Sequence, residues 1–106
     1  MEILLYTENV QKSQFILEMT SQEHGAVINV NGSEMMRAHY NLIVSIRDCG
    51  LYAKGIKPNR FWKITEVKKY FALKGNAEKI YNQLVRLRDE LTALAEMETE
   101  YEQENN

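Results

Sequence analysis

Residues 76–101 read NAEKIYNQLVRLRDELTALAEMETEY, and this stretch decides the fold because its apolar residues recur at alternating steps of four and three. The recurring positions are Ile80, Leu84, Leu87, Leu91, Leu94 and Tyr101, interrupted at Glu98. Such spacing predicts a long helix over residues 76–103, capped by Asn76. At 1.5 Å per residue, its single apolar seam would be about 40 Å long.

The predicted seam is longer than a small sheet can cover. Its distal half is therefore expected to pack against another copy of the chain, which makes residues 80–101 the predicted contact of a homo-oligomer. The chain has 106 residues, near the size at which oligomerisation often supplements burial within one chain. The alternative is a single helix that folds back on its own domain and ends in a frayed acidic segment.

The first 31 residues contain short apolar runs separated by Asn, Ser and Gly, which is typical of strands in a small sheet. These runs are residues 2–6, 14–19 and 26–30. They predict a three-stranded antiparallel meander, and a helix from Val10 to Met19 is the open alternative because short apolar runs suit both structures.

The segment after the strands predicts a helix over residues 33–49, with Ser33 as its N-cap and Gly50 as its C-terminal stop. This helix is expected to lie on the sheet. Residues 50–64 read as a basic loop, followed by a short helix over residues 65–73. The predicted fold class is α+β: one domain with a small N-terminal antiparallel sheet packed on a helix, then a short helix and the long C-terminal helix.

Charge is strongly segregated along the chain. Residues 54–88 contain ten basic and two acidic side chains, whereas residues 89–106 contain seven acidic and no basic ones, so the formal net charge of −2 hides two opposite blocks. A basic block of this strength favours a polyanion or a phosphorylated ligand as partner. The alternative is a solvated basic face that the acidic tail balances.

Composition and motifs exclude several classes of function. No apolar run approaches the roughly 18 residues of a membrane span, and the N-terminus lacks the pattern of a signal peptide, so a cytoplasmic protein without membrane contact is expected. The single Cys49 and the two histidines, His24 and His39, have no partner at metal-ligand spacing. No hydrolase or P-loop signature occurs, so we expect neither enzyme activity, nor a metal, nor a cofactor.

The start of the long helix is a candidate anion site. Free backbone N–H groups at residues 76–78 and the positive end of the helix dipole favour a bound phosphate. The residues predicted to serve it are Lys74, Gly75, Asn76 and Lys79. The alternative is purely structural: Thr65 caps the short helix, Gly75 ends it and Asn76 caps the next one.

Adjacent aromatic side chains within the basic loop supply the second part of a nucleotide site. Phe61 or Trp62 could stack on a base while Arg60 and Lys63 neutralise phosphate. Arg86 and Arg88, further along the chain, could complete such a pocket from a neighbouring subunit. The alternative is that one of the two aromatic rings, or both, belongs to the core.

The same residues allow a nucleic-acid interpretation. Residues 65–73, a turn and residues 76–88 have the outline of a helix-turn-helix, in which Asn76, Lys79, Asn82, Gln83 and Arg86 would face the major groove. Lys68 stands where this arrangement usually has a small residue, and the acidic tail would be repelled by the phosphate backbone. A third alternative is a protein–protein inhibitor whose acidic tail mimics nucleic acid.

Residues 51–76 read LYAKGIKPNRFWKITEVKKYFALKGN. This quarter of the chain resembles a segment of small accessory proteins of tailed phages. In length and outline the chain is also similar to phage proteins that counter Thoeris or CBASS immunity by sequestering nucleotide signals in oligomers. The resemblance implies a non-enzymatic binding protein that acts in the host cytoplasm and captures a phosphorylated nucleotide, cyclic nucleotides included.

Overall fold

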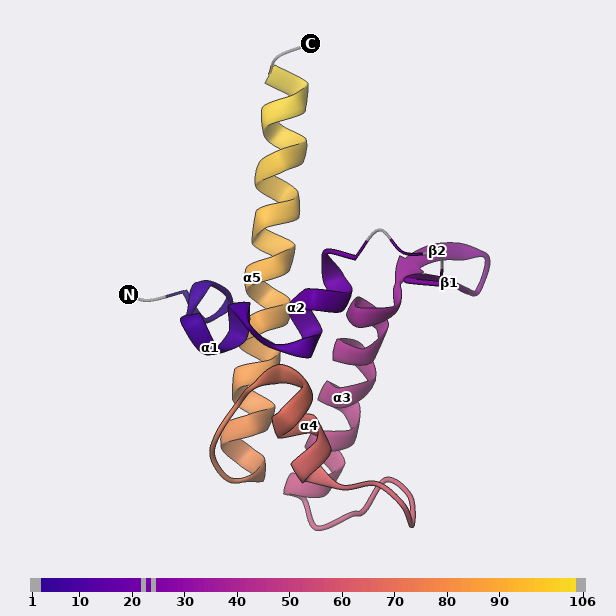
Figure 1. Ribbon diagram of the computed structural model, residues 1–106, viewed down its shortest axis with the longest axis vertical. Helices are drawn as coiled ribbons and strands as arrows, with labels where there is room; N and C mark the ends of the chain where they lie inside the picture. The colour runs from indigo at the N-terminus through magenta and orange to yellow at the C-terminus, as the bar shows by residue number, and fades with distance from the viewer. Residues whose placement is uncertain (1–2, 22, 24, 105–106) are drawn as a thin grey trace.

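The computed structural model describes residues 3–21, 23 and 25–104, with side-chain surroundings given as far as Glu98. Its elements confirm the α+β class: six helical segments accompany one antiparallel pair of strands. In chain order they are η1 (Leu4–Tyr6), α1 (Glu8–Gln11), α2 (Gln14–Met19), β1 (Val27–Val30), β2 (Ser33–Met36), α3 (Arg37–Ala53), α4 (Ile64–Phe71) and α5 (Ala77–Glu104). Helix α5 runs along the longest axis, and its distal end extends beyond the other elements (Figure 1).

The long helix was predicted correctly. Asn76 caps α5, because the backbone N–H of Lys79 donates a 2.9 Å hydrogen bond to Asn76 Oδ1. The first part of the apolar seam is fully buried against α3 and its neighbours. The fully buried members of this seam are Ile80, Leu84 and Leu87. Tyr101, the last predicted seam residue, lies outside the residues whose side chains are described.

The prediction of strands at the N-terminus is wrong for residues 4–6 and 14–19, whereas Ile3 is extended and precedes η1, and Glu2 lies outside the described residues. These segments are helical, with α1 and α2 separated by a turn at Lys12 and Ser13. The Ser13 hydroxyl accepts a hydrogen bond from the N–H of Ile16 and so begins a new helix. Phe15 is fully buried and packs on Phe71 of α4 with ring centroids 5.0 Å apart. Burial of that one ring decides the conformation of a short apolar run.

The strand predicted at residues 26–30 is present as β1, but its partner is the segment expected to begin a helix. Asn31 and Gly32 both have positive φ angles, 52° and 85°, which favours a tight hairpin turn. Val30 therefore pairs with Ser33, and Val27 with Met36. The predicted cap at Ser33 is wrong, since α3 begins only at Arg37.

Helix α3 also ends later than predicted. Gly50 lies inside the helix, and a Cβ atom there would be 3.2 Å from the Tyr81 ring of α5, so this glycine permits close helix packing. The helix ends at Ala53, and Gly55, with φ of 87°, follows the turn. Instead of lying on a sheet, α3 packs against α5 and α2. Among the described residues, the hairpin contributes no fully buried side chain to the core.

The short helix lies one or two residues from its predicted bounds. Lys63, not Thr65, occupies its N-cap position, and no side chain caps it there. At its other end Ala72 adopts the left-handed conformation with φ of 56°, a role that the sequence suggested for Gly75. The N–H of Leu73 donates to the carbonyl of Lys68 at 2.9 Å, which closes the helix end.

The N-terminal segment is held on α5 by one carboxylate. Glu90 accepts hydrogen bonds from the N–H groups of Leu4 and Leu5 at 2.9 and 2.8 Å. Arg86 donates its Nε–H to the same carboxylate at 3.1 Å. Because these N–H groups begin a helical turn that no side chain of η1 caps, Glu90 satisfies them and fixes η1 against the long helix.

Candidate functional site

The predicted site residues fall into three separate places. Arg60, Phe61, Trp62 and Lys63 lie in the loop between α3 and α4, here called the loop group. Lys74, Gly75, Asn76 and Lys79 surround the start of α5, here called the pole group. Arg86 and Arg88 lie further along α5.

Short-range hydrogen bonds hold the loop group in a defined shape. Asn59 organises the turn, since its side-chain oxygen accepts from the N–H of Phe61 at 3.0 Å and its carbonyl accepts from the N–H of Trp62 at 3.3 Å. The ammonium group of Lys57 donates to the carbonyl of Arg60 at 3.3 Å. The loop therefore presents its aromatic and cationic side chains from an ordered backbone.

The two adjacent aromatic rings have different surroundings. Trp62 is half-buried and packs on Tyr52, with ring centroids 4.9 Å apart and tilted planes. Phe61 is 80% exposed, the highest value among the exposed large apolar side chains that the structure describes. The guanidinium carbon of Arg60 lies 5.4 Å from the centroid of the Phe61 ring, a cation–π distance. Phe61 thus faces solvent while Trp62 anchors the loop.

A pocket of about 300 Å³ opens between the loop group, α3 and α4. Its volume is at the lower end of the range for small-molecule sites. The residues that line it are Asn41, Val44, Ser45, Phe61, Trp62, Lys63, Glu66, Val67, Tyr70 and Phe71. We call it the α3–α4 pocket. It combines an aromatic mouth with several polar side chains.

The sequence did not single out the polar side chains of this pocket. Asn41 and Ser45 are four residues apart on α3, and Glu66 and Tyr70 are four residues apart on α4. Each pair therefore lies on one face of its helix, and the pocket forms where the two faces meet. The repeated four-residue spacing of polar residues was the available signal, and it is too common to identify a site alone.

Hydrogen bonds fix the floor of the pocket. The amide of Asn41 donates to Tyr70 Oη at 3.2 Å, and the Tyr70 hydroxyl donates to the carboxylate of Glu18 on α2. Burial, together with this hydrogen bond and the charge of Glu18, raises the pKa of Tyr70 to about 12, against the opposing effect of Asn41. The phenol therefore stays protonated near neutral pH and keeps the Asn41 amide oriented.

The pole group has an internal structural role. Gln83 donates from Nε2 to the carbonyls of Lys74 at 2.9 Å and Lys79 at 3.1 Å, and Asn76 caps α5. Gly75 has a φ of 128°, and a Cβ atom there would meet Lys79 Cβ at 2.9 Å. These contacts account for the glycine and the asparagine as parts of a helix start.

The loop group and the pole group are not brought together. Neither of the two pockets that Lys63 lines contains a residue of the pole group. The loop from residue 54 to residue 63 and the segment that leads into α5 lie on different sides of the α3–α4 pair (Figure 1). The two sets of cations therefore act, if they bind anions, at separate places.

The two arginines of α5 take part in ion pairs along the helix. Arg86 bonds Glu90 at 3.1 Å, and Arg88 lies 3.2 Å from Asp89. Their side chains remain 44% and 45% exposed. Both arginines lie outside the residues that line the α3–α4 pocket.

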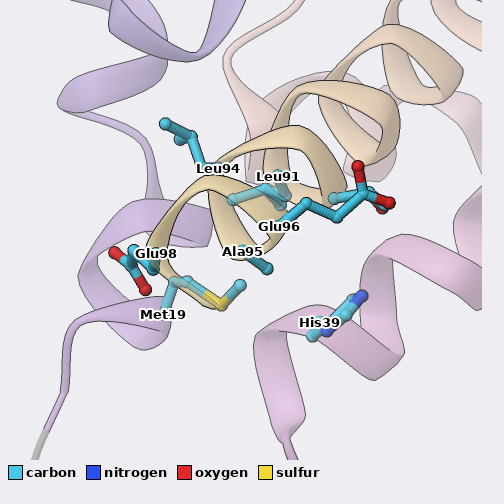
Figure 2. Close-up of a pocket in the computed structure, with 8 residues that line it drawn as sticks. Met19, His39, Leu91, Leu94, Ala95, Glu96 and Glu98 are labelled. Atoms are coloured by element: carbon cyan, nitrogen blue, oxygen red, sulfur yellow. The ribbon is translucent and has the colours of Figure 1, made fainter. Parts of the chain in front are cut away.

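A second, larger cleft of about 710 Å³ lies where α5 diverges from α2 and α3. Figure 2 shows Ala95 facing Met19 and His39 across the cleft, with Glu96 and Glu98 extending to opposite sides. Leu91, Thr92 and Leu94 complete the lining. Apolar carbon surface dominates this cleft, more strongly than in the α3–α4 pocket, where polar side chains take a larger share of the lining.

Groups with covalent or metal-binding chemistry are sparse in the described part of the chain. Cys49 is buried, and that burial, with the neighbouring Asp48 charge, raises the pKa of its thiol to about 11, so it remains protonated and a poor nucleophile near neutral pH. No three His, Cys, Asp or Glu side chains in the described segments are grouped as a metal site would require. Of the described helices, none combines the length and apolarity needed to cross a membrane.

Comparisons with protein-family models, curated proteins and solved structures found no match to this chain. The likeness of residues 51–76 to phage accessory proteins therefore stays a prediction.

Proposed function

We propose that this chain is a non-enzymatic binding protein whose α3–α4 pocket captures a planar, phosphorylated ligand of the nucleotide class. The observation that carries the proposal is Phe61, an apolar ring 80% exposed at the edge of a pocket that has both apolar and polar lining, with the Arg60 guanidinium near one face of the ring. Burying such a ring releases about 1.5–3 kcal/mol, so its exposure favours a binding partner.

A nucleobase matches the mouth of the pocket. A planar base can stack on Phe61, and stacking of this kind contributes about 1–3 kcal/mol per base. Arg60, held beside the ring, adds a cation that can follow the stacked base or reach its phosphate. One rigidly held loop thus supplies both an aromatic face and a positive charge.

The polar side chains that line the pocket can hydrogen-bond the edge of a base or a sugar. Asn41, oriented through Tyr70, and Ser45 offer donors and acceptors from α3, while Glu66 on α4 can accept from an exocyclic amino group. Lys63 supplies the charge for a phosphate at the rim. None of the described ion pairs uses Arg60 or Lys63, so both cations remain available for a ligand.

The biological setting of the proposal follows from the resemblance of residues 51–76 to phage accessory proteins. A small phage protein that binds a nucleotide signal, cyclic or linear, without converting it would counter a host defence that depends on that signal. Its place of action would be the host cytoplasm. The pocket supports the binding step of this proposal, and the resemblance supports its setting.

Duplex recognition by α4 and α5 has less support. Two of the side chains that it requires have internal partners: Gln83 donates to two backbone carbonyls, and Arg86 pairs with Glu90. Capture of a single nucleotide requires neither side chain. The inhibitor alternative, in which the acidic tail contacts a host protein, concerns residues at the opposite end of the molecule from the α3–α4 pocket (Figure 1).

The proposal is tested by calorimetric titration of a panel of mono-, di- and cyclic nucleotides into the full chain at fixed ionic strength. Phe61→Ala should raise the dissociation constant of the best ligand by about 5–150-fold, which corresponds to the loss of one base-stacking contact. Tyr6→Ala is the matched control, because Tyr6 is also an exposed aromatic residue, at 56%, but lies on η1. Absence of binding across the panel, or equal affinities for the two variants, would contradict the proposed function.

A further inference from the structure

We propose that a second copy of this chain fills the cleft between α5 and the α2–α3 junction, and that the occupying segment is the distal part of the partner's α5, residues 91–98. The contact is two-fold symmetric and antiparallel. It involves none of the residues that line the α3–α4 pocket, so the inference is independent of the proposed ligand.

Along the cleft, the protomer covers the apolar seam of α5 only in part. Leu84 and Leu87 are fully buried against the body of the molecule, whereas Leu91 and Leu94, the next members of the seam, are only half-buried. Both leucines line the cleft. The seam therefore continues past the point at which α3 ends its cover, and a further helix is the structure that such spacing accommodates.

The shape of α5 makes its own distal part available as the missing helix. This part extends beyond the other elements along the longest axis (Figure 1). The side of α5 that borders the cleft carries Ala95 between two glutamates that extend to opposite sides, and Ala95 faces Met19 and His39 (Figure 2). An alanine at the centre of a contact lets two helices approach closely.

In a two-fold symmetric contact, the same surface of each copy must both form the groove and fill the groove of the other copy. Residues 91–98 meet this requirement, because they form one wall of the cleft and also project from the molecule. An unrelated partner would instead have to supply a separate apolar helix. The chain itself contains the required sequence.

Charge selects the antiparallel direction. Five glutamates follow one another at alternate positions from residue 96 to residue 104, and a parallel pair would place both sets side by side. In an antiparallel pair that crosses near Ala95, the two sets run in opposite directions from the crossing point. Arg88, which is 45% exposed and pairs with Asp89, lies two helical turns before Ala95 on the same side of α5, so Glu98 of the other copy comes within about one helical turn of its level.

Sedimentation equilibrium of the full chain at tens of micromolar tests the contact. The wild type should have the mass of two chains, and Ala95→Glu should raise the dimer dissociation constant at least tenfold, because it places a carboxylate in the apolar centre. Ala93→Glu is the matched control: it makes the same change at an exposed alanine on a different side of α5, next to Val85 and Asp89, and should leave the constant within twofold. A monomeric wild type, or equal effects of both substitutions, would overturn the proposal.

Spin labels distinguish the direction of pairing. Lys79 is exposed and lies 16 residues before Ala95, so labels on Lys79→Cys of the two copies should be about 40–50 Å apart in an antiparallel dimer that crosses near Ala95. The buried Cys49 should remain unlabelled near neutral pH. A distance below about 25 Å would indicate parallel helices and would contradict the arrangement.

Discussion

The loop group and the pole group both present cations to solvent, yet they differ in what surrounds those charges. Around Arg60 and Lys63 the chain exposes an aromatic ring and opens a pocket lined by both apolar and polar side chains. Around Lys74 and Lys79, hydrogen bonds from Gln83 and the Asn76 cap use the nearby backbone groups for the structure of α5 itself.

The difference shows that cationic charge alone does not define a binding site. A helix start with flanking lysines occurs wherever a helix is capped, and its N–H groups are partly satisfied by that cap. An exposed phenylalanine beside a hollow has no comparable structural explanation. We therefore assign ligand binding to the loop group and helix initiation to the pole group, and each assignment can be broken separately.

Among the changes that compare the two groups, removing charge from the loop group should have the largest effect. Arg60→Gln combined with Lys63→Gln should weaken nucleotide binding by about 10–100-fold, because each cation contributes charge-assisted hydrogen bonds to a phosphate. Lys74→Gln combined with Lys79→Gln removes the same net charge and should change affinity less than threefold. Titrations of both double variants at the same ionic strength measure the contrast, and equal losses would indicate a diffuse field instead of a site.

Glycine substitutions should cost more folding stability in the pole group than in the loop that carries the loop group. Gly75→Ala should lower the free energy of unfolding by about 1–3 kcal/mol, because its φ of 128° is strained for alanine and the new Cβ would lie 2.9 Å from Lys79 Cβ. Gly55→Ala, at φ of 87° with open space around its Cβ, should lower it by about 1 kcal/mol. Urea denaturation compares the two, and a greater loss at Gly55 would be inconsistent with a packed pole.

The cap at the start of α5 should affect folding but not binding. Asn76→Ala removes the acceptor for the Lys79 N–H and should lower the free energy of unfolding by about 1 kcal/mol, with nucleotide affinity unchanged. Asn82→Ala, an exposed position inside the same helix, is the control and should be close to neutral. If Asn76→Ala clearly lowered the affinity for the nucleotide while stability stayed normal, the anion site would have to be assigned to the pole group.

The smallest effect concerns the polar floor of the α3–α4 pocket at alkaline pH. Because the folded-state pKa of Tyr70, about 12, exceeds the ordinary tyrosine value near 10, the unfolded chain loses its proton first as pH rises. This residue's contribution to stability is thus complete below about pH 10 and is lost towards pH 12. Tyr70→Phe should flatten that part of the stability curve relative to Tyr6→Phe, whereas identical curves would mean that the Glu18–Tyr70 bond has no such linkage.

The structural elements that were predicted best from the sequence are those with a long periodic pattern. The α5 seam repeats over many turns, so both the helix and its Asn76 cap were predicted correctly. The strand at residues 26–30 was predicted, but whether a helix or a strand followed it depended on pairing between β1 and β2, which is not local. Short runs such as residues 14–19 suit a strand or a helix equally, and burial of Phe15 against α4 decided between them.

The candidate site was predicted in part, for a related reason. Phe61, Trp62, Arg60 and Lys63 are adjacent in sequence, so their association needed no knowledge of the fold. Their polar partners on α3 and α4 come from segments that meet only through helix packing. The pole group begins 11 residues after Lys63. Helix α4 lies between the two groups in the chain, and they lie on different sides of the α3–α4 pair (Figure 1).

The central claim, that a nucleotide binds at the loop group and the α3–α4 pocket, is tested most directly by mapping backbone amide shifts in a heteronuclear NMR titration of the full chain with the best ligand. We expect the largest shifts for the amide signals of residues 41–45 and 60–70. The amide signals of residues 74–79 should stay close to their positions in the free protein. Shifts concentrated at residues 74–79, with the Phe61 amide unmoved, would contradict it.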